Sequence, residues 1–176
     1  GIYIVNNIMA TDLLQQKGLF EKQLIHHKVS IPFVKIGANL EEEFLNYAEK
    51  NILNQCEKEG YIFNNDHKVV SYSAGKTLQS NIEYNVLYEF QVCYPHENMT
   101  FQCMIQNITK IGIKAILSHN EIENPIIVFA SQLHNPTIFE NDNNSKYNEG
   151  DIIQVKVISY RFEIHDPSIY VLAEII

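Results

Sequence analysis

The amino-acid sequence predicts an α+β N-terminal domain followed by an all-β, five-stranded barrel of the OB type. A single helix-like stretch, with an apolar residue at every fourth position, lies between strand-like segments in the first third of the chain. Five strand-like runs separated by turn residues then fill residues 99–176, and a long polar connection lies between the third and fourth of them. Five strands with such a connection suit an OB barrel.

The first two elements are an extension and a strand. Residues 1–18 show no clear period and end in "QQKG", so we interpret them as an extension. Residues 19–33 have the pattern of a strand. Pro32 is expected to end it, because proline lacks the N–H group that a strand ladder needs.

Residues 39–60 are expected to contain the main helix. Asn39 is a suitable N-cap, and Glu42, three residues later, can complete a capping box. Gly60 is a suitable stop signal. The apolar residues that recur at every fourth position, and are expected to share one face of the helix, are Leu40, Phe44, Ala48, Ile52 and Cys56.

After the helix the pattern becomes that of β-strands. Short strands are expected at 60–63 and 67–75, and a longer one at 80–95, where apolar and polar residues alternate. The turn "PHEN" (95–98) is the expected domain boundary. The expected domains are therefore an extension (1–18), an N-terminal domain (19–94) and a barrel domain (95–176). The five barrel strands are expected at about 99–108, 111–118, 124–130, 151–160 and 168–176.

Charge and composition exclude several classes of protein. The hydrophobic content of 45% argues against wholesale disorder. The net charge is −8, and the residues after Tyr94 hold 5 basic against 10 acidic side chains, a net −5. Because phosphate neutralisation supplies most non-specific affinity for nucleic acids, such a chain is not expected to bind them strongly alone. No apolar run is long enough to span a bilayer, so no membrane role is expected.

The three cysteines, Cys56, Cys93 and Cys103, are an odd number without CxxC spacing. This pattern favours free, buried thiols in a reducing, intracellular compartment.

No catalytic constellation emerges from the sequence. The motif "SAGKT" (73–77) ends like a phosphate-binding loop but lacks the upstream glycine and the strand-to-helix context. The seven histidines lack metal-ligand spacing. We therefore expect no cofactor, no metal and no enzymatic activity.

The order of motifs resembles the OB-domain stalk subunit of multisubunit DNA-dependent RNA polymerases, a family that includes the archaeal OB-domain stalk protein and the larger polymerase II stalk protein. The resemblance runs from about Phe20 to Ile176. It is carried by the ordered set "KVSIPFVKIGANLEEEF", "GYIFNNDHKVVSYSAGKTLQSNIEYNVLYEFQVCYP", "NITKIGIKAIL", "IIVFASQLHNP" and "NEGDIIQVKVISY".

The resemblance implies two functional surfaces. The loop 73–80 would be the tip that docks on the polymerase core at the base of its clamp. Its docking residues would be Ser73, Ala74, Gly75 and Lys76. The outer face of the barrel would contact nascent RNA, with phosphates meeting basic side chains and a base stacking on the aromatic ring. The residues implied for this RNA contact are Lys114, Phe129, Lys156 and Arg161.

The resemblance further implies core polymerase subunits as partners, together with a small helical stalk partner.

Gly112 is expected to let the backbone bend at the turn between the first two barrel strands. Compared with the family pattern, Ile111 and Lys114 stand where exposed aromatics are usual, and Cys103 replaces a strand glycine.

Two rival functions remain open at this point. One is a free-standing OB-fold RNA-binding protein of the translation-factor or exosome-cap type, which should bind RNA well by itself. The other is an enzyme of unrecognised type. The abundance of Asn and Ile and the single arginine suggest a version from a large DNA virus, acting in host cytoplasm and packaged in virions.

Overall fold

The computed structural model describes residues 18–37, 39–117, 124–139 and 146–176. The predicted extension lies outside them apart from Gly18. Two compact units are present. The first comprises Glu21–Asn54 and Ile62–Val92, and the second includes Gln55–Tyr61 and Cys93–Ile176. The predicted fold class, an α+β part followed by a five-stranded barrel, is confirmed.

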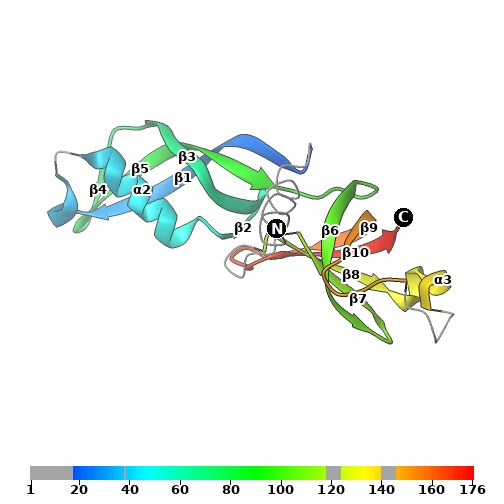
Figure 1. The fold of residues 1–176 in the computed structure, drawn as a ribbon. Coiled ribbons are helices and arrows are strands. Elements are labelled where there is room, and N and C mark those ends of the chain that lie inside the picture. The colour runs from blue at the N-terminus through cyan, green and yellow to red at the C-terminus, as the bar shows by residue number, and fades with distance from the viewer. Residues whose placement is uncertain (1–17, 38, 118–123, 140–145) are drawn as a thin grey trace, which may run out of the picture. The chain divides into compact units, whose positions relative to one another are not determined.

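The α+β part is built on a five-stranded sheet with the strand order β1–β5–β3–β2, in which β4 pairs with β5 (Figure 1). The predicted strand that ends at Pro32 is confirmed as β1. The elements are β1 (Phe20–Pro32), the 3-10 helix η1 (Phe33–Lys35), α2 (Leu40–Asn51), β2 (Gln55–Glu57), β3 (Gly60–Tyr72), β4 (Lys76–Leu78) and β5 (Asn81–Cys93).

The core of the first unit lies between α2 and the sheet. Phe44 is fully buried and makes edge-on ring contacts with Tyr72 and Tyr84, at centroid distances of 5.0 and 5.2 Å. The hydroxyl of Tyr88, on β5, donates to the backbone carbonyl of Phe44 at 2.8 Å. This bond satisfies a buried polar group that would otherwise be costly to bury. Helix and strands are thus joined by both packing and a hydrogen bond.

The helix starts where the sequence indicates but ends earlier. The side chain of Asn39 accepts from the Glu42 N–H at 3.2 Å, which confirms Asn39 as the N-cap. The Glu42 carboxylate accepts from the side-chain amide of Asn39 at 3.3 Å, and not from its backbone N–H as a full capping box requires. The expected continuation to Gly60 is wrong, because α2 ends at Asn51. Cys56 belongs instead to β2. Cys56 continued the four-residue spacing of apolar side chains by chance, although it lies in a strand and not in the helix.

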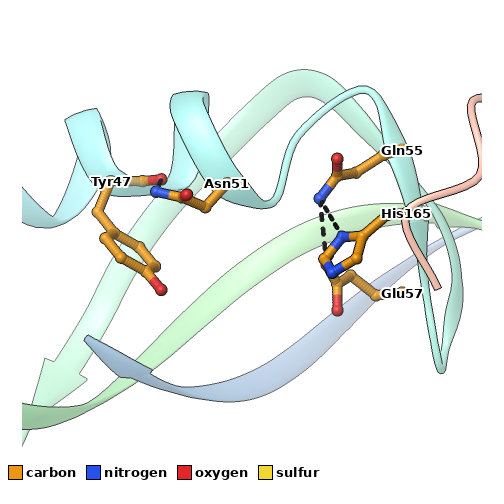
Figure 2. A network of polar contacts seen from close by, with 5 residues as sticks. All are labelled: Tyr47, Asn51, Gln55, Glu57 and His165. Atoms are coloured by element: carbon orange, nitrogen blue, oxygen red, sulfur yellow. Dashed lines mark hydrogen bonds and ion pairs between the residues drawn. The ribbon is translucent and has the colours of Figure 1, made fainter. Parts of the chain in front are cut away.

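The segment that contains β2 is attached to the barrel unit by backbone hydrogen bonds. The Cys56 N–H donates to the carbonyl of Asp166 at 2.8 Å, and the His165 N–H donates to the carbonyl of Cys56 at 2.7 Å. The Gln55 side-chain amide lies 3.0 Å from Nδ1 of His165, and Glu57 lies 4.0 Å from the same nitrogen (Figure 2). These long-range bonds explain why the chain leaves the helix before Gln55.

The two short strands expected at 60–63 and 67–75 form one continuous strand, β3. Asn64, Asn65 and Asp66 lie between the two expected strands, and Asn and Asp are common in turns. In the structure the strand continues through this segment, and the backbone leaves the extended conformation at Asp66, whose φ is 52°. A single left-handed residue is tolerated inside a long strand, since Asp adopts this conformation more readily than most residues.

The second unit is a closed barrel in the order β10–β8–β7–β6–β9. Neighbouring strands are antiparallel except β8 and β10, which are parallel. All five predicted barrel strands are confirmed, and the topology is that of an OB barrel. The strands are β6 (Thr100–Thr109), β7 (Gly112–Ile116), β8 (Ile126–Ser131), β9 (Ile152–Arg161) and β10 (Ile169–Ile175). The connection from β8 to β9 carries η2 (Gln132–His134) and the short helix α3 (Pro136–Phe139).

Within the described ranges, no helix is long and apolar enough to cross a membrane.

All three cysteines are buried with free thiols. Burial raises the pKa of Cys103 to about 12. Burial also raises the pKa of Cys56 to about 12, with smaller contributions from the negative charges of Asp166 and Glu57. The pKa of Cys93 is likewise raised, mainly by burial. Since the thiolate is the reactive form, all three are inert in the folded state near neutral pH.

We therefore expect a thiol reagent at pH 8 to label the folded chain slowly and to label three thiols per chain after denaturation without reductant. The measurement is a time course of thiol labelling followed by mass spectrometry. Rapid labelling of the folded chain, or a Cys93–Cys103 bridge found after denaturation, would contradict this expectation.

Candidate docking tip and nucleic-acid interface

The expected docking residues form the exposed end of the first unit. Ser73, Ala74 and Gly75 connect β3 to β4, and Lys76 is the first residue of β4. All four are exposed. The loop is held at Ser73, whose N–H donates to the Asn85 carbonyl and whose hydroxyl accepts from the Asn85 N–H, both at 2.9 Å. The tip is therefore a fixed projection of the sheet.

The glycine of the tip serves the chain's own packing. A Cβ added to Gly75 would lie 2.5 Å from Cγ2 of Ile82 and 2.8 Å from Cε1 of Tyr84. Both distances are too short for van der Waals contact. Gly75 is thus required for loop closure over β5, whereas Ala74 faces solvent and is free to meet a partner.

Sequence reasoning missed an apolar surface that adjoins the tip segment. The side chains of Phe33 and Val34, in η1, are 61% and 93% exposed, and Leu78 of β4 is 43% exposed. The Phe33 N–H donates to the Ser80 carbonyl at 3.0 Å, which ties η1 to the turn that follows β4. The signal was present in the sequence as "PFV", an apolar group placed after the strand-ending proline.

On the barrel, the structure brings Lys114 and Phe129 together as predicted. They are directly opposite each other on β7 and β8, and both are exposed. Asn107 on β6 is paired with Lys114 on the other side, and Leu172 on β10 is paired with Phe129. A cation, an aromatic ring and an amide therefore lie in one row on the outer face of the barrel.

Gly112 is explained by the same aromatic ring. A Cβ on Gly112 would lie 2.6 Å from Cζ of Phe129 and 2.7 Å from the carbonyl oxygen of Ala130. The φ of Gly112 is not in the left-handed region, because the positive-φ glycines among the described residues are Gly18, Gly60 and Gly150. The turn is formed by Lys110 and Ile111, directly before Gly112. The missing Cβ of Gly112 lets the Phe129 ring and β8 approach closely.

The other two expected RNA contacts lie on β9. Arg161 is exposed and is paired with Tyr170 on β10. Lys156 is half-buried and lies between Thr100 on β6 and Glu174 on β10. The structure thus does not bring Lys156 into the row of Lys114 and Phe129, and a carboxylate is its cross-strand neighbour.

Tyr170 was missed by sequence reasoning. Its side chain is 46% exposed, and it lies two residues before Leu172 on the same face of β10. The signal was the alternation of buried Ile169, Val171 and Ala173 with outward residues. An exposed tyrosine at the outward position of a barrel strand resembles the stacking platforms of single-strand-binding OB folds.

Among the residues that the structure describes, no group of three or more His, Cys, Asp or Glu side chains is placed to hold a metal ion.

These observations define the class of the protein: an OB-barrel protein with an additional α+β unit. Over 174 aligned residues the chain is 23% identical to a protein of Acanthamoeba polyphaga mimivirus named "Putative DNA-directed RNA polymerase subunit L376". The alignment covers 93% of this chain and 85% of that relative. No protein-family model matches the chain. The resemblance to RNA polymerase subunits that was inferred from the sequence is confirmed at this level, since the similar viral protein is named as a DNA-directed RNA polymerase subunit.

Proposed function

We propose that the chain is a non-catalytic stalk subunit of a viral DNA-dependent RNA polymerase, which docks on the core near the clamp and contacts nascent RNA. The observation that carries the proposal is the similarity to the mimivirus polymerase subunit, because it extends over 93% of the chain and so includes both units. A shared barrel alone would indicate little, since OB folds serve many functions.

Docking is assigned to the tip of the first unit. Its exposed small residue Ala74 and the exposed apolar side chains of Phe33 and Val34, which lie on the 3-10 helix tied to Ser80, are of the kind that a partner surface can bury. Lys76 adds a single positive charge. The partners would be the large core subunits, with a small helical stalk subunit as a further one.

RNA contact is assigned to the outer face of the barrel. Lys114 can meet a phosphate while a base stacks on Phe129, which is 37% exposed. The barrel half is acidic overall, so the contact is weak alone and becomes effective when docking holds the barrel close to the transcript. The chain would then act where the viral polymerase acts, in host cytoplasm and in the virion.

The rival function is a free-standing OB-fold RNA-binding protein. The two are distinguished by the strength of RNA binding in isolation. A stalk subunit needs little affinity of its own, because the polymerase supplies a high local concentration of RNA. A free RNA-binding protein has to supply the whole affinity itself.

We expect the isolated chain to bind single-stranded RNA with a dissociation constant of about 10 µM or weaker at physiological salt, with little sequence preference. Lys114, Arg161 and Lys156 are the cations of this contact, and each phosphate contact on a single strand contributes about −0.7. The logarithm of the association constant should therefore fall with the logarithm of the salt concentration with a slope of about −2. Fluorescence anisotropy with labelled RNA at several salt concentrations measures both quantities. Tight, sequence-selective binding at moderate salt would favour the rival function.

Within the assembled polymerase, reversing charge at Lys114 and Arg161 should reduce crosslinking of nascent RNA to this chain and leave docking intact, because the docking residues lie in the other unit. The same reversal at Lys58, whose side chain is 81% exposed on the β2–β3 turn, is the matched control. Equal crosslinking in all three proteins would contradict the assigned RNA contact.

A further inference from the structure

We propose that Tyr170 and Arg161 form a second contact for single-stranded RNA, which continues the Lys114–Phe129 contact across β10 and β9. The inference rests on the proposed RNA contact and deepens it. It assigns a base-stacking role to Tyr170 and places Arg161, already one of the proposed cations, directly beside that ring. The ligand is a single strand, because an exposed ring can stack on a base only when that base is free of a partner.

The register of the strands makes the two contacts continuous. Phe129 is paired with Leu172, and Tyr170 lies two residues earlier on β10, on the same outer face. From strand spacing and rise per residue, the Phe129 and Tyr170 backbones are roughly 8 Å apart. Arg161 then lies directly opposite Tyr170 on the next strand. One diagonal across four strands thus contains, in order, Lys114, Phe129, Tyr170 and Arg161. The two aromatic rings lie in the middle and a cation lies at each end.

The charge on this diagonal differs from that of the chain as a whole. The chain has a net charge of −8. The outward residues of the two rows contain two cations and no carboxylate. In order across the barrel they are Asn107, Lys114, Phe129, Leu172 and Ser159 in one row, and Ile127, Tyr170 and Arg161 in the other. A carboxylate-free strip on an acidic protein is what a polyanion requires.

Packing on either side of Arg161 holds this arginine outward. The hydroxyl groups of Tyr160 and Tyr94 are 2.8 Å apart, and the ring of Phe162 lies 6.0 Å from that of Tyr94. Both neighbours of Arg161 are therefore anchored to the same tyrosine, while Arg161 itself is exposed. A cation on an anchored backbone loses less freedom when it binds than one on a loop.

The test uses the full chain and a labelled oligouridylate of about 16 nucleotides, the upper end of OB-fold site sizes. Binding is measured at low salt, where the affinity is highest. Tyr170→Leu keeps an apolar side chain next to Ile127 but removes the ring, and should weaken binding by about 5- to 150-fold. Tyr170→Phe keeps the ring and should bind like the unchanged protein.

Arg161→Gln should make the salt slope shallower by about 0.7, the contribution of one phosphate contact on a single strand. Lys58→Gln, which removes one charge from the exposed β2–β3 turn, is the matched control and should leave the slope less affected. Thermal unfolding of each variant shows whether the barrel remains folded.

The outcomes separate this inference from the proposed function. If Lys114 and Phe129 variants weaken RNA binding while Tyr170→Leu does not, Tyr170 is not a stacking contact and the proposed Lys114–Phe129 contact stands. If Tyr170→Leu and Arg161→Gln instead reduce capture of polymerase subunits without affecting RNA binding, the strip is a protein contact and the inference is overturned. Equal losses for Tyr170→Phe and Tyr170→Leu would also overturn it, because stacking needs only the ring.

Discussion

Replacing Ala74 by tryptophan should lower the affinity of the chain for the polymerase core by at least about 30-fold, the effect of losing one interface hot spot of 2 kcal/mol. Ala74 is exposed at a loop that Ser73 fixes through two hydrogen bonds with Asn85. Because the loop cannot easily retreat, a large side chain there should hold the two surfaces apart. The measurement is capture of core polymerase by the tagged chain, titrated to obtain an affinity.

Two controls make this result specific. Ala74→Ser keeps the side chain small and should bind normally. Lys58→Trp places the same bulk on a turn of the other unit, at a side chain that is 81% exposed. Gly75 is unsuitable for the test, since a side chain there would collide with Ile82 and Tyr84 and disturb the fold itself. Capture of the core by Ala74→Trp at wild-type strength would show that the tip is not the docking surface.

The second large effect is expected at Phe44. Phe44→Ala should lower the free energy of unfolding of the first unit by about 3–5 kcal/mol, as for other buried Phe→Ala changes. The ring is fully buried and contacts Tyr72 and Tyr84. Tyr72 directly precedes the tip loop, and Tyr84 lies under Gly75. Loss of the Phe44 ring should therefore loosen the tip as well.

Hydrogen exchange read by mass spectrometry tests this in the folded chain. Peptides from β5 should exchange at least about 100-fold faster in Phe44→Ala, because they become exposed whenever the first unit opens. Peptides from the barrel strands should change little. Val34→Ala, at a side chain that is 93% exposed, is the matched control and should shift stability by no more than about 0.5 kcal/mol. Unchanged β5 exchange would mean that Phe44 is not central to this core.

Much of the fold could be predicted from local sequence. Three features follow from patterns within a few residues: the N-cap bond between Asn39 and Glu42, the end of β1 at Pro32, and all five barrel strands. The end of α2 could not be predicted in this way. The backbone of Cys56 forms hydrogen bonds with Asp166 and His165, about a hundred residues further along the chain. The spacing of apolar residues in a short segment carries no information about such long-range bonds.

The candidate site was predictable in part for the same reason. Lys114 and Phe129 lie on neighbouring antiparallel strands, so alternation along each strand was enough to place both outward. Tyr170 depends on the parallel pairing of β10 with β8, and its pairing with Arg161 lies beyond a register shift at Leu172 and Ala173. A register shift changes which residues face each other, and sequence alternation does not reveal it. Gly75 and Gly112 were noticed, but the side chains that approach them come from other strands.

The central claim is that this chain is a subunit of an RNA polymerase. It is tested most directly by purifying the tagged chain from the cells that naturally produce it and quantifying the associated proteins by mass spectrometry. We predict that the large polymerase subunits co-purify in stoichiometric amounts and remain bound after ribonuclease treatment, since docking is a protein–protein contact. Recovery of the chain alone, or with ribosomal or exosome components that ribonuclease releases, would contradict the account.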